Sequence, residues 1–472
     1  MAANTIDIAN ELERFQTAEA GDLILGYSPA GHKHGYFPIT SILRGGYACR
    51  RWNIHNSSPK GEAVGNIDYL RELPSLLGLG CYLVDKNHGR RKLHPDDHYK
   101  FVDGSPAKLD GSMGDYMWGW GTVWYYANWI EGDYYYEAIG LNPIPGKQNY
   151  RFSVASTSAI GGSVIDRDTG EMVSVINNSP RYRGGNNDSS KDGAFNTLLG
   201  RVATNQTTEW FGNAARKKGI GWEGYWYTFS AAVGILMRII FGTRDAQAAW
   251  NPSKDSNGLY QGGFGSGVTT AGGWWGEKFG YYPFLPTSVG VELGDHCGIS
   301  NYIVKEGGTT LYTAPVPCFF GLKNFFGYIG RLGRGEIFRK IDGGAAEHWV
   351  MPSMYKIYNM NSIEGLILAN ILPAHPTAGW NYAKQISMHL LSFTPTVVGA
   401  TSSTGYCDGI YNDNAVSGLR ASLRGGHASS GDGAGPGCLF VDNGVSVAGA
   451  YYGSPLCEAE EDMSPMPIIV AM

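Results

Sequence analysis

The stretch from residue 416 to residue 457 gathers the side chains that best suit ligand recognition. Two arginines there offer forked N–H donors that fit the acidic groups of sugars. A histidine and an aspartate add polar contacts, and two tyrosines add flat faces for stacking. Each type also has a plainer role, because paired arginines on a strand often form ion pairs within the chain and tyrosines near a chain end often pack. The predicted recognition residues are Arg420, Arg424, His427, Asp432, Tyr451 and Tyr452.

The cysteines are the residues that would carry redox chemistry. Seven are scattered along the chain without C-x-x-C spacing, so they specify neither a zinc site nor a disulfide framework. Cys438 and Cys457 are the only candidates for a catalytic pair, yet both are expected at strand ends, where an inert buried thiol is the commoner case. No nucleophile, base and orienting residue stand together in the sequence. We therefore predict no enzymatic activity, no catalytic residue and no cofactor.

Two histidines, His94 and His98, have the spacing of metal ligands. Pro95 lies between them, however, and no helical pattern flanks them. The sequence therefore predicts a solvated loop at this point and no metal site.

Strands must hold the recognition residues. Leu419, Ala421 and Leu423 alternate with polar residues, which predicts a strand with one apolar face. Residues 438–441 predict a buried strand, and Asp442-Asn443-Gly444 and residues 445–452 predict a turn and a returning strand. The glycine-rich loop 425–437 has almost no apolar anchor of its own. We therefore expect a three-stranded antiparallel ribbon that presents an exposed, mobile loop.

Three helices are predicted in the body of the chain. Residues 225–241 carry apolar side chains at helical spacing and at most other positions, and Gly242 fits a left-handed cap, so a helix buried almost all round is expected. A shorter helix is expected within residues 208–219. Residues 67–79 also have helical spacing, but Pro74 is expected to end that helix.

Aromatic residues crowd the stretch 115–136. Trp118 and Trp120 alternate with glycine, as in strands whose rings pack closely on a neighbour. Flat rings of this kind also stack on sugars, so core packing and sugar binding are both open. Core packing is preferred, because aromatic side chains dominate the cores of β proteins.

The composition limits the class of protein. Of 472 residues, 17% are charged, 13% are aromatic and 68 are glycine, which indicates a loop-rich β protein with a large core. The formal net charge of -5 argues against nucleic acid as a partner. Acidic residues precede any apolar run at the N-terminus, which argues against a secretory signal, and residues 229–241 are too few to span a bilayer. These features fit a protein made in a reducing cytoplasm and used in a virion.

Several short motifs carry a resemblance to a known family. Residues 164–176 match D-x-x-T-G-x-x-x-S-V, and residues 180–187 follow with P-R-Y-R-G-G-N-N. Near the end, Arg424-Gly425-Gly426 and residues 453–457, G-S-P-L-C, match a closing turn and strand. Together these motifs resemble the C-type-lectin-like domains of phage tropism determinants and formylglycine-generating enzymes.

The resemblance implies an α+β fold, in which two helices flank an antiparallel sheet. It implies an N-terminal attachment and oligomerisation module over residues 1–79, where residues 6–15 predict a short docking helix. A receptor-binding domain over 80–457 and a tail over 458–472 follow. The function implied is that of a phage tail-fibre or tail-tip protein that binds a bacterial surface glycan or protein.

The implied partners and alternatives complete the expectation. The chain is expected to be a homotrimer in the virion tail, joined to other tail proteins through its N-terminal module. A formylglycine-generating-like oxidase acting through Cys438 and Cys457 is the enzymatic alternative. A structural tail spacer without direct receptor contact is the third reading.

Overall fold

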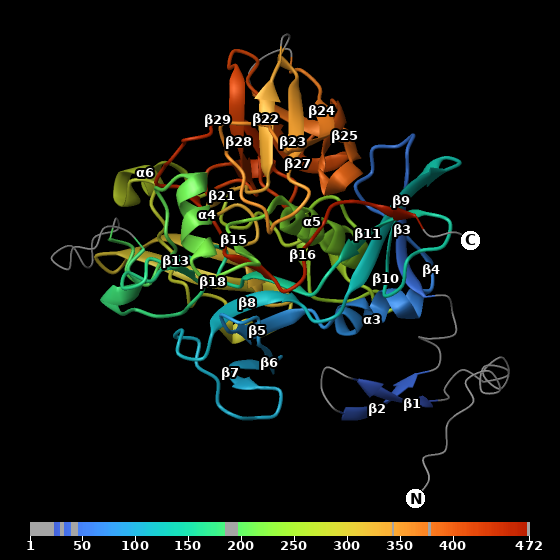
Figure 1. The fold of residues 1–472 in the computed structure, drawn as a ribbon, viewed down its shortest axis with the longest axis horizontal. Helices are drawn as coiled ribbons and strands as arrows, with labels where there is room; N and C mark the ends of the chain where they lie inside the picture. Colours follow the sequence, from blue (N-terminus) through green and yellow to red (C-terminus); the bar gives the residue numbers. More distant parts are fainter. Residues whose placement is uncertain are drawn as a thin grey trace, which may run out of the picture.

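Three large β-sheets surround one central helix in the computed structural model (Figure 1). The structure describes residues 23–28, 33–38, 46–184, 197–341, 344–375 and 379–469. Strands account for 39% of it and helices for 14%. The described α-helices are α3 (Ile67–Leu77), α4 (Thr208–Arg216), α5 (Tyr227–Phe241) and α6 (Gly272–Phe279), and the 3-10 turns are η1 (Pro180–Tyr182), η4 (Val291–Leu293), η6 (His389–Leu391) and η7 (Gly431–Gly433).

The two sheets nearer the N-terminus have mainly antiparallel neighbours. The six-stranded sheet has the order β32 (Ile468–Ile469), β11 (Gln148–Phe152), β9 (Trp124–Glu131), β10 (Tyr134–Gly140), β3 (Tyr47–Asn53), β4 (Glu62–Gly65). The seven-stranded sheet has the order β15 (Trp222–Glu223), β31 (Cys457–Ala459), β12 (Ala155–Ser158), β8 (Asp115–Trp120), β5 (Gly80–Val84), β6 (Arg90–His94), β7 (Asp97–Phe101).

The ten-stranded sheet curls until its two edges meet. Asn370 on one edge strand donates from Nδ2 to Thr394 Oγ1 at 2.9 Å and to the Pro395 carbonyl at 3.0 Å on the other. Its order is β24 (Ile367–Leu372), β23 (Ala346–Val350), β22 (Glu336–Lys340), β28 (Gly418–Arg424), β29 (Leu439–Gly444), β27 (Tyr406–Tyr411), β25 (Trp380–Ser387), β26 (Thr394–Val398), with β21 (Gly330–Leu332) and β30 (Tyr452–Gly453) attached beside β28.

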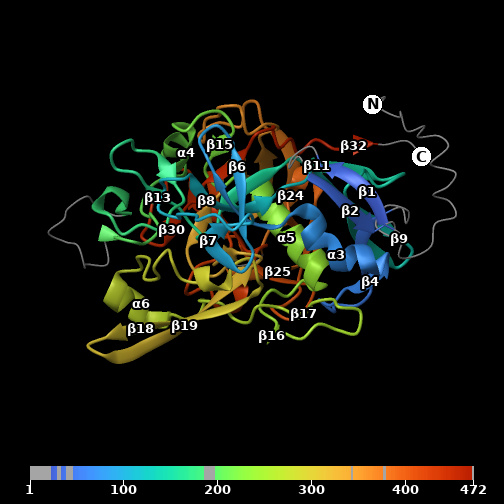
Figure 2. The same ribbon diagram turned by 90° about the horizontal axis from the view of Figure 1, so that it is seen from below.

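Short hairpins complete the structure. The longest, β18 (Gly298–Glu306) with β19 (Thr309–Phe319), projects from one side of the molecule (Figure 2) and continues into β20 (Leu322–Lys323). The two-stranded pairs are β1 (Leu23–Ser28) with β2 (Lys33–Pro38), β13 (Val164–Ile165) with β14 (Met172–Val173), and β16 (Trp250–Asn251) with β17 (Gln261–Gly262). The β13–β14 pair lies within residues 164–176, which carry the D-x-x-T-G motif.

Helix α5 lies at the centre of the core, and every one of its residues is buried. It touches all three sheets: Arg238 pairs with Glu137 on β10, Phe229 packs on Trp120 of β8, and the Arg238 guanidinium lies over Tyr406 of β27. Gly242 ends the helix in the left-handed conformation. The predicted helix over residues 225–241 is confirmed.

The predicted α+β lectin-like fold is wrong. Among the described residues, two helices do not flank one antiparallel sheet; strands dominate, and three large sheets enclose α5. The physical reason lies in α5 itself, because a helix that is apolar all round must be covered on every side and cannot lie on one face of a single sheet. The shorter predicted helix exists as α4, where the Thr207 side chain caps Trp210 N–H.

The predicted three-stranded ribbon is confirmed in part. Strand β28 forms as expected and pairs antiparallel with β29. Residues 442–444 do not turn, however, because Asn443 and Gly444 continue the ladder opposite Ala421 and Arg420. The returning strand shrinks to β30, which pairs in parallel with β21. The expectation for Pro74 is also wrong, since α3 continues past it to Leu77.

The predicted N-terminal boundary falls within shared structure. Strand β3, before residue 79, pairs with β10 over seven residues, and the buried side chains of α3 belong to the main core. The boundary at residue 79 stays a prediction, and the helix predicted over residues 6–15 lies outside the described residues. No helix in the described parts is long and apolar enough to cross a membrane.

Candidate functional site

Arg424 is not the exposed donor that the sequence predicted. Its side chain is 1% exposed and forms a two-pronged ion pair with Glu336 of β22, with Nε to Oε1 at 2.7 Å and Nη2 to Oε2 at 2.6 Å. Burial alone would raise the pKa of Glu336, but the Arg424 charge and hydrogen bonds from Arg424 and His348 hold it well below its usual range. Arg424 therefore stabilises the ten-stranded sheet and is closed to a ligand.

Arg420 is half-buried and turns back on its own ribbon. It donates from Nη1 to the Asp442 carbonyl at 3.3 Å and from Nη2 to the Ser417 carbonyl. Tyr452 is 9% exposed, and its hydroxyl donates to Asn443. Both side chains thus form hydrogen bonds within the protein.

The glycine-rich loop 425–437 is mostly buried, so its predicted exposure is wrong. Gln247 donates from Nε2 to the Gly431 and Ala434 carbonyls at 3.0 and 2.8 Å, and Gly437 N–H donates to Asp408 at 2.7 Å. At Gly426, with φ at +74°, a Cβ would lie 3.0 Å from Ala434, so the chain folds tightly on itself. The loop needs no apolar anchor, because side chains from other elements hold its backbone.

Three aromatic side chains stand side by side on neighbouring strands of the ten-stranded sheet. Trp380 of β25 is the register partner of Tyr411 on β27, which is in turn the partner of Phe440 on β29. The ring centroids are 5.6 Å apart for Trp380 and Tyr411, 5.6 Å for Tyr411 and Phe440, and 4.9 Å for Trp380 and Phe440, so the three rings are in mutual contact. All three are partly exposed, while their chain neighbours Ile410 and Leu439 point into the core.

The series continues beyond the sheet. His427 of the loop stacks on Phe440 at 5.7 Å, Tyr451 meets His427 at 5.0 Å, and Tyr281, which follows α6, meets Tyr451 at 6.0 Å. Buried Trp275 of α6 supports this end from beneath, at 6.2 Å from Tyr451. We call the six partly exposed residues the aromatic row: Tyr281, Tyr451, His427, Phe440, Tyr411 and Trp380.

Two polar groups accompany the row. Burial lowers the pKa of His427 to about 4, so the ring is neutral near pH 7. Its Nδ1 accepts the Ser429 N–H at 3.4 Å, which leaves the hydrogen on Nε2 as a donor. Asp432 is exposed in η7, and Gly433, the last residue of η7, lies against the Trp380 ring. The row thus carries one donor and one charged acceptor.

The structure unites two of the six predicted residues in this row, His427 and Tyr451, and places Asp432 at its far end. The sequence did not predict the other four residues of the row, which are Tyr281, Phe440, Tyr411 and Trp380. Trp380 and Tyr281 lie far along the chain from residues 416–457; strand pairing brings Trp380 to the row, and the packing of α6 brings Tyr281. The one sequence signal was local: Tyr411 and Phe440 each follow a core residue in an alternating pattern.

The aromatic stretch 115–136 mainly forms core, as the sequence analysis favoured over sugar binding. Its fully buried rings are Tyr116, Trp118, Trp120, Trp124 and Tyr126.

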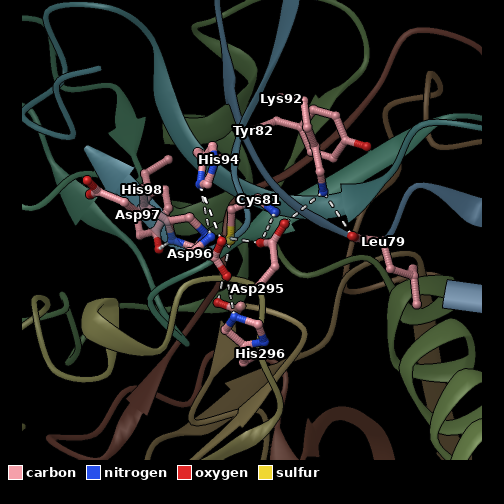
Figure 3. Close-up of polar contacts among 12 residues, drawn as sticks. Leu79, Cys81, Tyr82, Lys92, His94, Asp96, Asp97, His98, Asp295 and His296 are labelled. Atoms are coloured by element: carbon pink, nitrogen blue, oxygen red, sulfur yellow. Dashed lines mark hydrogen bonds and ion pairs between the residues drawn. The ribbon is translucent and has the colours of Figure 1, made fainter. Parts of the chain in front are cut away.

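A second cluster of reactive side chains lies between β5, β7 and the turn before β18 (Figure 3). Cys81, His98 and Asp295 bring donor atoms within 4.8 Å of one another. His98 is 1% exposed, so the predicted solvated loop is wrong at this residue. Only His98 joins the cluster; His94 faces Asp96, whose carboxylate also meets His296 at 2.7 Å.

Every group of this cluster already has a partner. Asp295 Oδ1 accepts from Cys81 N–H at 2.7 Å and lies 2.9 Å from His98 Nε2, while Lys92 Nζ lies 3.0 Å from Oδ2. His98 Nδ1 lies 2.6 Å from Tyr116 OH, which accepts from Lys323. The set contains the ligand types of a zinc site.

Two ammonium groups beside the cluster oppose a bound cation. Burial raises the pKa of the Cys81 thiol well above its usual range and lowers that of His98. Neither ring nitrogen of His98 is paired with Cys81, so the three residues do not form a nucleophile and base. The cluster is best explained as an internal polar network that joins three segments of the chain.

The two cysteines of the oxidase alternative are both buried, and all cysteines in the described residues are free thiols. Burial raises the pKa of both thiols; Asp408 adds to the effect at Cys438, while the Thr157 hydroxyl opposes it at Cys457. A protonated thiol is a poor nucleophile, so neither position favours redox chemistry.

Comparisons with known proteins give no family for this chain. A scan of protein-family models finds no match, and a search of curated proteins finds none either.

Proposed function

We propose that this chain is a receptor-binding protein of a phage tail, and that it attaches the virion to a glycan on the bacterial surface through the aromatic row. The observation that carries the proposal is the row itself, with six partly exposed rings of which three are register partners across adjacent strands. A contiguous group of partly exposed aromatic rings is the kind of surface that marks an interaction site.

The row has the features of a surface for sugars. Pyranose rings present flat C–H faces that pack on aromatic side chains, and their hydroxyls need a few well-placed donors and acceptors. His427 and Asp432 stand where they can supply one of each. The row is held rigidly, because β25, β27 and β29 are paired and Trp275 packs beneath the other end.

The place in a phage tail is supported by the sequence motifs alone, that is, residues 164–176, 180–187 and 453–457. The trimer and the contacts with other tail proteins have the same support. The oxidase alternative is not favoured, since the thiols of Cys438 and Cys457 are buried and protonated. The spacer alternative gives no reason for an exposed aromatic row.

Two measurements test the proposal. Antibody against the purified chain should label the tails of virions in electron micrographs, and excess purified protein should slow adsorption of the phage to its host. Absence of the chain from virions would contradict the tail location. Labelled tails together with unchanged adsorption would favour the spacer.

A further inference from the structure

We infer that the aromatic row recognises uncharged sugars and discriminates against acidic ones; this inference rests on the proposed function. The sequence suggested the opposite, since Arg420 and Arg424 were expected to offer forked donors to acidic groups. In the structure Arg424 is buried, and Arg420 is half-buried with its guanidinium turned onto backbone carbonyls. What remains at the row is an aromatic face with polar groups of a different kind.

The two arginines that the sequence offered for recognition already have partners within the protein. Arg424 is buried against Glu336, and Arg420 donates to the Asp442 and Ser417 carbonyls. Within the described part of the chain, no arginine or lysine lies over any of the six rings, although such contacts occur at many other rings. An acidic sugar would therefore lose hydration at the row without gaining a positive partner.

A carboxylate stands at the Trp380 end of the row. Asp432 is exposed beside Trp380, and its charge adds to the effect of burial in raising the pKa of Tyr382 on the same strand. Asp408, which accepts from the Gly437 N–H, and Asp245 lie beneath the same loop, and burial raises the pKa of both, so Asp432 is the carboxylate that a ligand would meet. A carboxylate or phosphate on the ligand would meet repulsion from this end of the row.

The remaining polar groups suit hydroxyls. The neutral His427 ring donates from Nε2, and Asp432 accepts. A pyranose placed on Tyr411 and Phe440 would have both groups near it, because His427 stacks on Phe440 and Gly433 of η7 lies against Trp380, whose ring is 4.9 Å from that of Phe440. Uncharged hexose units meet each of these features without an unpaired charge.

The experiment measures binding of purified, labelled chain to cells of the host strain after four treatments. Periodate cleaves the vicinal diols of sugars, carbodiimide with an amine converts surface carboxylates to amides, protease removes surface proteins, and raised salt screens charge. The expected result is loss of binding after periodate. Binding should change by less than about twofold after amidation, after protease, and between low and high salt, because no exposed charge pair holds the ligand.

Each other outcome contradicts a different step. Loss of binding after amidation, or a decline of about tenfold at high salt, would overturn the charge preference while leaving attachment intact. Loss after protease with resistance to periodate would show a protein receptor. No binding to untreated cells would contradict the proposed function itself. A variant gives a further test. Asp432→Lys should bind cells rich in acidic polysaccharide more strongly than the parent does. Equal binding of the two proteins to such cells would also overturn the inference.

Discussion

Arg424 and Glu336 face each other across the ten-stranded sheet as a buried, two-pronged ion pair, with N to O distances of 2.7 and 2.6 Å. Glu336 also accepts from Ser422 and meets His348 at 2.7 Å. Such a pair has good geometry and full hydrogen bonding, and removal of one partner leaves the other charge buried and unpaired.

The first prediction concerns stability. Arg424→Ala should lower the free energy of unfolding by about 3 to 5 kcal/mol, because it strands the Glu336 carboxylate in the core. Arg420→Ala, on the same strand, is the control and should cost less, roughly 1 to 2 kcal/mol, since it removes hydrogen bonds to two carbonyls and leaves no buried charge unpaired. Urea unfolding of both variants measures the difference. Equal losses would show that the Glu336 pair does not hold the sheet.

The second prediction concerns the central helix. Leu236 is fully buried in α5, so Leu236→Asp should prevent folding by burying an unpaired charge. Ile357→Asp is the control, because Ile357 is 84% exposed. Expression, solubility and thermal melting are compared. A soluble Leu236→Asp chain with a cooperative melt would contradict the position of α5.

These two predictions also show how far the structure can be predicted from the sequence. The buried helix could be predicted, because its apolar residues are local and periodic. The burial of Arg424 could not be predicted, since its partner Glu336 is 88 residues away in the chain and is brought in by strand pairing. His427 and Tyr451 could be predicted because they lie within residues 416–457, whereas Trp380 and Tyr281 come from distant segments that only the folded chain brings to the row. Long-range pairing also decides the sheet order, so the wrong fold class came from motifs that fix only local turns.

The third prediction concerns pH. Burial raises the pKa of Asp408 to about 7, with Asp245 adding to the effect, and the Gly437 N–H and Arg238 opposing it. A folded-state pKa above the unfolded value gives stability that is present below about pH 4 and is lost as the pH rises to about 7. Asp408→Asn keeps the uncharged form, so its stability relative to the parent should increase by roughly 4 kcal/mol over that range.

The check is urea unfolding of both proteins at a series of pH values. A difference between Asp408→Asn and the parent that stays constant with pH would show that Asp408 titrates as it does in the unfolded chain.

The fourth prediction concerns the cysteines. A Cys438→Ser, Cys457→Ser double variant should keep its fold and its binding to host cells, because neither thiol lies on the aromatic row. The parent should show no aerobic oxidation of a cysteinyl peptide, measured as oxygen uptake. Oxidation by the parent that disappears in the double variant would establish the oxidase.

The aromatic row is tested most directly by removing rings from it and measuring affinity for host cells. Tyr281→Ala and Tyr411→Ala remove two partly exposed rings, and Tyr99→Ala removes an exposed tyrosine of similar exposure on β7, at 50% against 46% for Tyr281. With melting temperatures close to the parent's, each row variant should weaken binding by about 1 to 3 kcal/mol, which is roughly fivefold to more than a hundredfold in Kd. Tyr99→Ala should bind as the parent does. Unchanged binding by both folded row variants would contradict the assignment of receptor recognition to the aromatic row.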